Sequence, residues 1–167
     1  LPKYRGPSPI ESALLDGIMT TGVSIMKLDS GMDTGPILTQ SAFIIHPNAT
    51  AGTLEVACGQ AGGELLLQTL PHYLDGTLLP QEQDASLATV CKKISKEMGE
   101  ITLTTNGAEV QRKFRALTPW PSVYFFIDHA DKHMRVKVTA VDLELIGSDT
   151  LTASDVITHV TPEGKQE

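Results

Sequence analysis

The sequence predicts an α/β region followed by a small β-barrel, and three observations support this division. Strand-like and helix-like stretches alternate up to about residue 75, a polar and turn-rich stretch follows, and the remainder contains short strands around one helix. We place the first part at residues 1–76, a linker at 77–95 and the second part at 96–167. A chain of 167 residues with 41% apolar residues can form one ordinary domain or two small ones.

The first part contains two expected helices and two expected strands. Residues 8–11 form a helix start, in which Ser8 caps the helix and the following proline takes the first helical position. Alternating apolar residues rich in β-branched side chains predict strands over 21–28 and 37–45. The stretch 51–75 is expected to be helical, with an apolar stripe that comprises Leu54, Ala57, Cys58, Leu65, Leu66, Leu70 and Leu74.

The second part has a different pattern, with short strands expected at 101–105, 122–128, 133–141 and near 156–160. One helix is predicted over 107–117. Asn106 precedes it as a capping residue, and Glu109 follows three positions later, which is the spacing of a capping box. Short strands around a single helix are typical of a small barrel or sandwich.

Composition and spacing exclude several classes of function. The net charge of −7 and the pI of about 5.2 argue against a generally basic nucleic-acid binder, although a local basic patch remains compatible with them. No apolar run approaches the length of a membrane span, so we expect a cytoplasmic chain with no membrane partner. Cys58 and Cys91 have no metal-ligand spacing and the five histidines form no cluster, so we expect no metal.

Residues 28–36 read LDSGMDTGP and place two carboxylates and two glycines between the two expected strands. The tripeptide 33–35 matches the active-site motif of aspartic proteases, but those enzymes need two such aspartates and this chain has one copy. On residue types alone, Asp33 can orient a histidine, accept a proton from an amine or cap its own loop. Asp29 ends the strand directly and is expected to form a local turn.

Three segments carry a resemblance to a known family. Residues 1–38, the stretch KKISKEMGEI and the stretch RALTPWPSVYF resemble the 10-formyltetrahydrofolate-dependent transformylases. The segments 95–97 and 119–121 narrow the resemblance to the branch that formylates methionyl initiator tRNA. The resemblance implies that the first part is the C-terminal half of a Rossmann-like formyltransferase domain and that the second part is an OB-like barrel.

The resemblance also implies a site. Asp33 matches the catalytic aspartate of the family, which acts with an Asn and a His on the attack of the methionyl amine on the formyl carbon. Contacts to the cosubstrate 10-formyltetrahydrofolate are implied for the surrounding loop residues Asp29, Gly31, Met32 and Gly35. In the family the Asn and His lie just before the segment that begins here at Leu1. We therefore expect this chain to be a fragment that is inactive alone, from a parent that is a monomer.

A basic stretch is the expected contact to the tRNA partner. Six cations fall within 24 residues that contain three acids, and they are Lys92, Lys93, Lys96, Arg112, Lys113 and Arg115. Lys96 matches a linker lysine on the tRNA side in the family, whereas the other five are inferred from clustering alone. A cluster of this kind can contact a phosphate backbone, or it can be an ordinary solvated helix face.

Two other functions stay open on the sequence alone. A related transformylase acting on a nucleotide-sugar amine, or a hydrolase of 10-formyltetrahydrofolate, shares the loop around Asp33. A non-enzymatic RNA-binding module is the alternative from another class.

Overall fold

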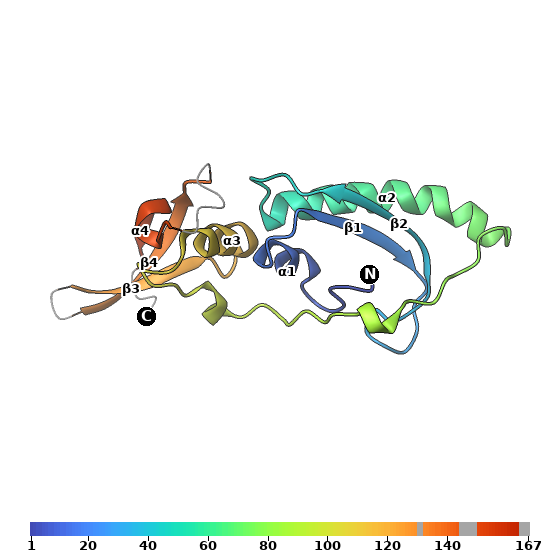
Figure 1. Cartoon of the computed structure of the whole chain (residues 1–167), viewed down its shortest axis with the longest axis horizontal. Helices are drawn as coiled ribbons and strands as arrows, with labels where there is room; N and C mark the ends of the chain where they lie inside the picture. The colour runs from blue at the N-terminus through green and yellow to red at the C-terminus, as the bar shows by residue number, and fades with distance from the viewer. Residues whose placement is uncertain (130–131, 144–149, 164–167) are drawn as a thin grey trace. The chain divides into compact units, whose positions relative to one another are not determined.

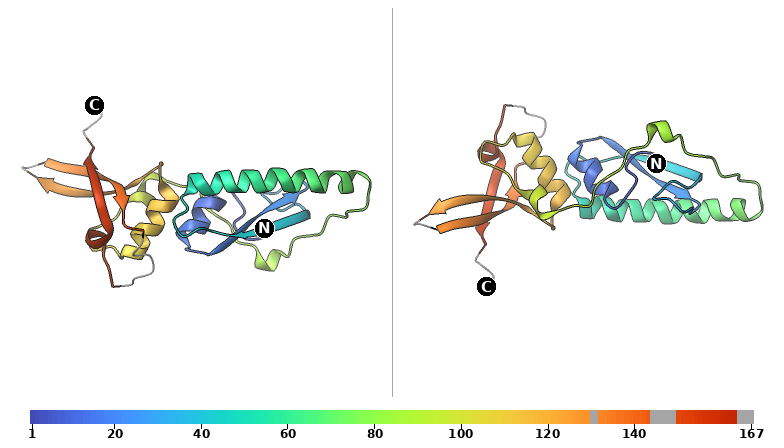
Figure 2. Two further views of the ribbon diagram at one scale, coloured as in Figure 1. Left: turned by 90° about the horizontal axis from the view of Figure 1, so that it is seen from above. Right: turned by 90° about the horizontal axis from the view of Figure 1, so that it is seen from below.

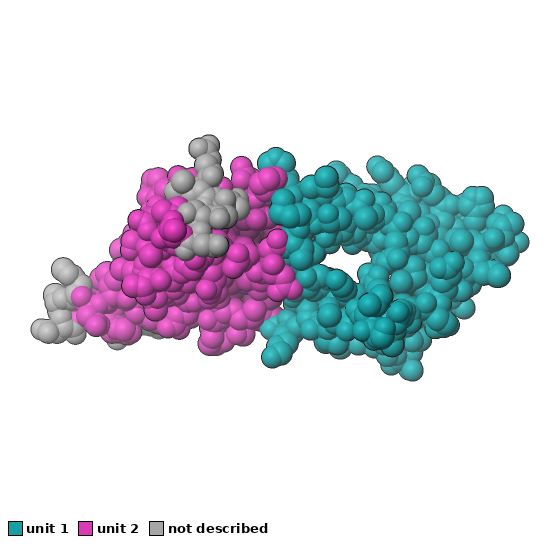
Figure 3. All heavy atoms as spheres, viewed as in Figure 1, with its two compact units in different colours: residues 1–13, 18–46, 52–93 teal, residues 14–17, 47–51, 94–167 magenta. Residues whose placement is uncertain are grey.

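The computed structural model describes residues 1–129, 132–143 and 150–163. The chain divides into two compact units, which are coloured separately in Figure 3. Unit 1 comprises residues 1–13, 18–46 and 52–93, and unit 2 comprises residues 14–17, 47–51 and 94–167. Among the described residues, no helix has the length and apolar character needed to cross a membrane.

Unit 1 is built on an antiparallel hairpin of β1 (Thr20–Met26) and β2 (Ile37–Ile44), which confirms the two expected strands. Ser24 lies opposite Gln40, and a register shift occurs at the end of β1, between residues 25 and 26. The short helix α1 (Pro9–Leu15) precedes the hairpin, and the long helix α2 (Ala51–Leu74) runs along it (Figures 1 and 2).

Helix α2 buries much less of its surface than the sequence suggests. Only Leu54 and Thr69 are buried, whereas Leu66, Leu70 and Leu74 are 43%, 44% and 74% exposed. The expected apolar stripe was therefore wrong for these three leucines and for the exposed Ala57. A two-stranded hairpin is narrow, so within the described residues it covers only one side of the helix.

Unit 2 contains a three-stranded antiparallel sheet in the order β3 (Val123–His129), β4 (Lys132–Val141) and β5 (Ile157–Pro162). Helices α3 (Gly107–Leu117) and α4 (Ala153–Val156) complete the unit, and two 3₁₀ turns lie at 85–87 and 96–99 along the chain. One apolar core joins the sheet to both helices, and it consists of Ile101, Val110, Val123, Phe125, Val136, Val138, Ala153 and Val156.

The sheet of unit 2 is open. Within the described ranges each sheet is antiparallel and none closes on itself, so the expected OB-like barrel is not confirmed, while the mixed α/β content is. Three strands are too few to complete a barrel, because closure around a packed interior takes more strands with a matching tilt and stagger.

The expected strand at 101–105 is not formed. Ile101 donates one backbone bond to the Tyr124 carbonyl at 2.9 Å, but the following residues make a turn. The Thr105 hydroxyl accepts a bond from the Thr102 amide at 2.9 Å, and the Thr102 hydroxyl lies 3.1 Å from the hydroxyls of both Thr104 and Thr105. These local bonds compete with strand pairing for the backbone.

Helix α3 begins and ends where the sequence predicts. The Asn106 side chain accepts a hydrogen bond from the Glu109 amide at 3.2 Å, which satisfies one free donor of the first turn. The next residue, Gly107, packs against α4, since a Cβ there would lie 3.0 Å from a methyl group of Val156.

Candidate functional site

The loop between β1 and β2 is tightly closed. Lys27 donates its amide to the Pro36 carbonyl at 2.9 Å. A Cβ on Gly35 would stand 1.8 Å from the Lys27 carbonyl oxygen, and a Cβ on Gly31 would stand 2.1 Å from the hydroxyl oxygen of Thr34. Glycine is therefore required at both positions because the backbone and a neighbouring side chain approach closely.

Asp29 holds this loop together from within. One of its carboxylate oxygens accepts the Gly31 amide at 2.9 Å, and both accept the Thr34 hydroxyl, at 2.7 and 2.8 Å. This is the turn-forming role that the sequence suggests for Asp29.

Asp33 adopts an unusual backbone conformation with φ of 54°, a region that non-glycine residues rarely occupy. The Gly6 amide donates to its Oδ2 at 2.7 Å. Gly6 is itself held beside residue 91, since the Cys91 amide donates to the Arg5 carbonyl at 2.8 Å. The described residues engage only Oδ2 of this carboxylate, which leaves Oδ1 able to accept a proton.

Gln83 holds the backbone of the loop at Asp33 and at Gly35, two residues further along the chain. Its Nε2 donates to the Asp33 carbonyl at 2.9 Å and to the Gly35 carbonyl at 2.7 Å. Its Oε1 accepts from Arg5, at 3.2 Å from Nε and 2.8 Å from Nη2. The Gln83 amide group therefore donates both of its hydrogen bonds to the loop, and the Arg5 guanidinium fixes the orientation of that amide.

Replacing Gln83 with Ala should loosen this loop. Two loop carbonyls lose their donor, and Arg5 loses its partner, so local opening becomes easier by about 1 kcal/mol. Hydrogen exchange of the Lys27 amide, which closes the loop, should become several-fold faster. Gln60→Ala is the matched control, because Gln60 is exposed on α2. Equal exchange in both variants would contradict this role of Gln83.

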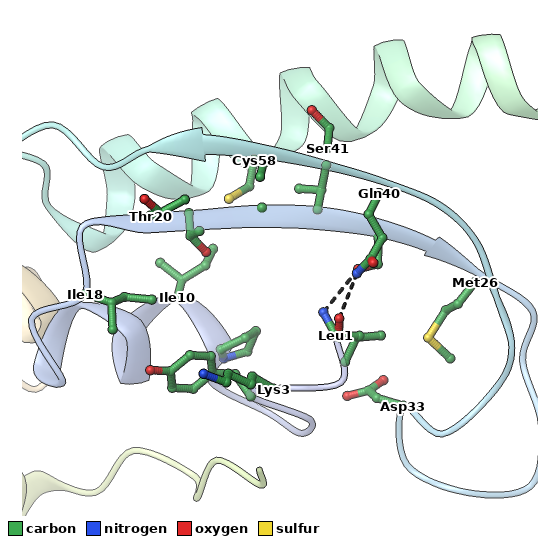
Figure 4. Close-up of a pocket in the computed structure, with 17 residues that line it drawn as sticks. Leu1, Lys3, Ile10, Ile18, Thr20, Met26, Asp33, Gln40, Ser41 and Cys58 are labelled. Carbon is green, nitrogen blue, oxygen red and sulfur yellow. Dashed lines mark hydrogen bonds between the residues drawn. The ribbon is translucent and has the colours of Figure 1, made fainter. Parts of the chain in front are cut away.

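Asp33 lies on the wall of a pocket of about 640 Å³ (Figure 4). A hollow is visible in unit 1, drawn in teal, in the space-filling view (Figure 3). Apolar side chains of α1, β1 and the segment between them line much of the pocket, and polar groups come from Lys3, Tyr4 and Gln40. Cys58 also lines it, and burial raises the pKa of this thiol, which disfavours the reactive thiolate. The volume is in the range of pockets for small organic ligands.

Asp33, the expected catalytic residue, lines the pocket. The four loop residues expected to contact the cosubstrate are not part of the described lining; these are Asp29, Gly31, Met32 and Gly35. Met32 is 64% exposed. Sequence reasoning missed Lys3, Tyr4 and Gln40. A sequence signal existed for Gln40, because Gln40 and Ser24 are polar residues within largely apolar strands. The structure places these two residues opposite one another.

The six expected tRNA contacts fall in both units. Lys92 and Lys93 are exposed in unit 1, and Lys96 is exposed in unit 2. Arg112 is half-buried, and Lys113 pairs with Glu109 at 3.1 Å and donates to the Glu100 carbonyl at 2.9 Å. The three exposed lysines are thus the most accessible of the six.

Arg115 has a different environment from the other five cations. It is 8% exposed, and its Nε donates to the Ala49 carbonyl at 2.8 Å. Burial lowers the pKa of its guanidinium from the ordinary arginine value. Its packing suits a structural residue better than a phosphate contact.

The described part of the chain contains no group of three or more His, Cys, Asp or Glu side chains that could hold a metal ion. The described lining of the pocket contributes one positioned carboxylate, Asp33, beside neutral and cationic polar groups.

Comparison with known proteins agrees with this geometry. The family model described as formyl transferase matches residues 1–70, and the model described as formyl transferase, C-terminal domain, matches residues 93–165. A methionyl-tRNA formyltransferase of Chloroflexus aggregans is 46% identical over 126 residues, which are 75% of this chain and 41% of that protein. The chain thus spans about two fifths of the length of the curated relatives it matches.

Solved structures show the same fold. A methionyl-tRNA formyltransferase from Clostridium thermocellum aligns with a TM-score of 0.65 at 21% identity, over 98% of this chain and 65% of that one. An N-formyltransferase from Helicobacter canadensis, in complex with folinic acid and dTDP-3-aminofucose, aligns with a TM-score of 0.67 at 21% identity, over 85% of this chain and 53% of that one. The two family models, which together span both units of the fold, show that the chain belongs to the formyltransferase family.

Proposed function

We propose that this chain is part of a methionyl-tRNA formyltransferase, which transfers a formyl group from 10-formyltetrahydrofolate to the α-amino group of methionyl initiator tRNA. The observation that carries the proposal is the Asp33 carboxylate, held on the wall of the pocket by the Gly6 amide. The curated relatives of that name, at 41% to 46% identity, support the tRNA as acceptor.

The pocket fits a folate in size and in lining. A pterin ring has flat apolar faces and polar edges, and the pocket offers Ile10, Ile18 and Met26 beside the polar groups of Lys3 and Gln40. The bound cosubstrate supplies the formyl group. The chain contributes a carboxylate whose Oδ1 can take the proton of the attacking amine, directly or through one water molecule.

The remaining catalytic groups of the proposed site come from outside this chain. The described lining of the pocket contains no histidine and no asparagine. We therefore expect the isolated chain to lack formyl transfer. A fusion protein should restore the reaction. In it, the part of the Chloroflexus aggregans relative that precedes the region matching this chain is joined to Leu1. We call this fusion protein the chimera.

The identity of the molecule that accepts the formyl group distinguishes this proposal from its alternatives. The chimera should formylate methionyl initiator tRNA, and a nucleotide-linked amino sugar should neither react nor compete. Formylation of the sugar in place of the tRNA would overturn the proposed acceptor, and release of formate without an acceptor would indicate a hydrolase.

We propose that residues 1–76 belong to the catalytic domain, that 77–95 form a linker and that 96–167 form a reduced OB-like domain. The division of the family matches, at 1–70 and 93–165, supports this assignment. We also propose that the whole enzyme is a monomer.

We propose that exposed lysines of the linker contact the tRNA backbone. Lys96→Ala in the chain should weaken binding to initiator tRNA and reduce the slope of log affinity against log salt by roughly 0.9, the value of one phosphate contact. Lys27→Ala is the matched control, because Lys27 is an exposed lysine outside the basic stretch. Titration by fluorescence anisotropy at several salt concentrations measures both quantities. An unchanged slope for Lys96→Ala would contradict the contact.

A further inference from the structure

One face of the β3–β4 ribbon in unit 2 carries rings and cations where an ordinary solvated sheet carries separated polar side chains. Side chains alternate between the two faces of a strand, so Phe126 and Asp128 of β3 share a face with the residues opposite them on β4. Those opposite residues are Arg135 and His133, and Tyr124 lies opposite Lys137. The other face contributes Val123, Phe125, Val136 and Val138 to the core.

The rings on this face contact one another, with one stacked pair and one edge-to-face pair. The Phe126 and His133 rings lie parallel, with centroids 4.6 Å apart and an angle of 11° between the planes. Tyr124 meets Phe126 edge to face at 5.7 Å. The Arg135 guanidinium lies over the Tyr124 ring, 3.7 Å from its centroid. Phe126 and His133, one from each strand, thus form a parallel ring pair, and the covered Tyr124 ring supports it from the side.

Hydrogen bonds and ion pairs hold these groups in place. His133 Nδ1 lies 2.8 Å from an Asp128 carboxylate oxygen, and Arg135 pairs with Glu163 at 3.1 Å. The inner part of the stack is covered, since Tyr124 is 6% exposed, and burial together with nearby Glu100 raises the pKa of its phenol. The outer part is open, because Phe126 is 41% exposed and the His133 side chain is 65% exposed.

We propose that Phe126 and His133 form a stacking surface for unpaired bases of RNA. A base has a flat π surface that suits an exposed aromatic pair, and Lys137 on the same face supplies a positive charge for the adjoining phosphate. A peptide partner is less well suited to this surface, because peptides commonly dock in apolar grooves and here a cation or a carboxylate flanks each ring. The surface comprises other residues than the exposed lysines of the linker, and it would add base contacts to their proposed phosphate contacts. This inference rests on the proposed RNA partner.

The test compares Phe126→Ala and Leu103→Ala in the 167-residue chain, because both remove a side chain of unit 2 of similar exposure, 41% and 45%. The probes are a short unstructured oligoadenylate and a fully paired RNA duplex of equal length, followed by fluorescence anisotropy. Phe126→Ala should weaken oligoadenylate binding by roughly 5- to 100-fold with an unchanged salt slope, since stacking releases no counterions. Leu103→Ala should change it by less than about two-fold.

Two further variants keep the proposal testable. Phe126→Tyr retains a ring and should retain the affinity, which separates loss of stacking from loss of folding. Lys137→Ala should reduce the salt slope by roughly 0.7, the value of one contact to a single strand.

Tighter binding to the duplex than to oligoadenylate, or equal affinities for Phe126→Ala and wild type, would overturn the stacking surface while leaving tRNA formylation intact. Absence of any RNA binding by the wild-type chain would overturn both this proposal and the RNA partner.

Discussion

Asp33→Asn in the chimera is expected to lower kcat for formyl transfer by about 10²–10⁴-fold and to leave KM for the tRNA nearly unchanged. A positioned general base contributes a factor of this size, and an amide of the same shape cannot take the proton of the attacking amine. The side-chain oxygen of Asn can still accept the Gly6 amide, which now meets Oδ2 at 2.7 Å. The loop should therefore keep its conformation while the chemistry fails.

Asp29→Asn is the control for this experiment, because it makes the same chemical change four residues away in the same loop. Asp29 accepts bonds from Gly31 and Thr34, and an Asn oxygen can retain at least one of them. Its kcat should stay within a few-fold of wild type. Steady-state formylation assays that give equal losses for the two variants would assign both carboxylates to the loop and neither to the reaction.

Gly35→Ala is expected to destabilise the chain by about 1–3 kcal/mol, the range for an added methyl group in a filled space. The new Cβ would stand 1.8 Å from the Lys27 carbonyl oxygen, which belongs to the backbone and cannot rotate away. The loop must then open at the residue whose carbonyl Gln83 holds at 2.7 Å. Formyl transfer by the chimera should fall as well, because Asp33 is two residues away.

Gly63→Ala provides the matched comparison. It lies within α2, and a Cβ there meets nothing within 4 Å. Both changes reduce the freedom of the unfolded chain equally, so the difference between them reports on the native environment. Gly63→Ala should stabilise the chain by about 0.5–1 kcal/mol. Urea unfolding followed by circular dichroism measures both values, and a Gly35→Ala chain as stable as Gly63→Ala would contradict the close approach.

The elements predicted correctly are those whose signals are local. Helix α3 runs over the expected residues because Asn106 caps it within its own first turn. The strands β1 and β2 have alternating, β-branched sequences, and the loop between them contains its own turn former in Asp29. These interactions join residues a few positions apart, so the sequence alone is enough to predict them.

The features that were missed depend on residues distant in the sequence. Arg115 looks like any surface cation, and only the fold places it beside the Ala49 carbonyl. Gln83 follows a proline-containing turn-rich stretch, and nothing nearby indicates that it holds residues about fifty positions earlier. Leu70 and Leu74 match an apolar helix stripe, but their burial depends on which surfaces lie next to α2.

The sequence by itself determined the family, the loop that carries Asp33 and the local ends of α3, because each of these resides in a short continuous stretch. Only the tertiary structure decided how that loop is used. It placed Asp33 on the wall of a pocket and kept the Asp29 side chain bonded within the loop. It also brought the Gly6 amide to the Asp33 carboxylate and the Gln83 side chain to the Asp33 carbonyl. It likewise set Phe126 against His133 across two strands. Such contacts arise from chain segments that meet only on folding, so no local pattern records them.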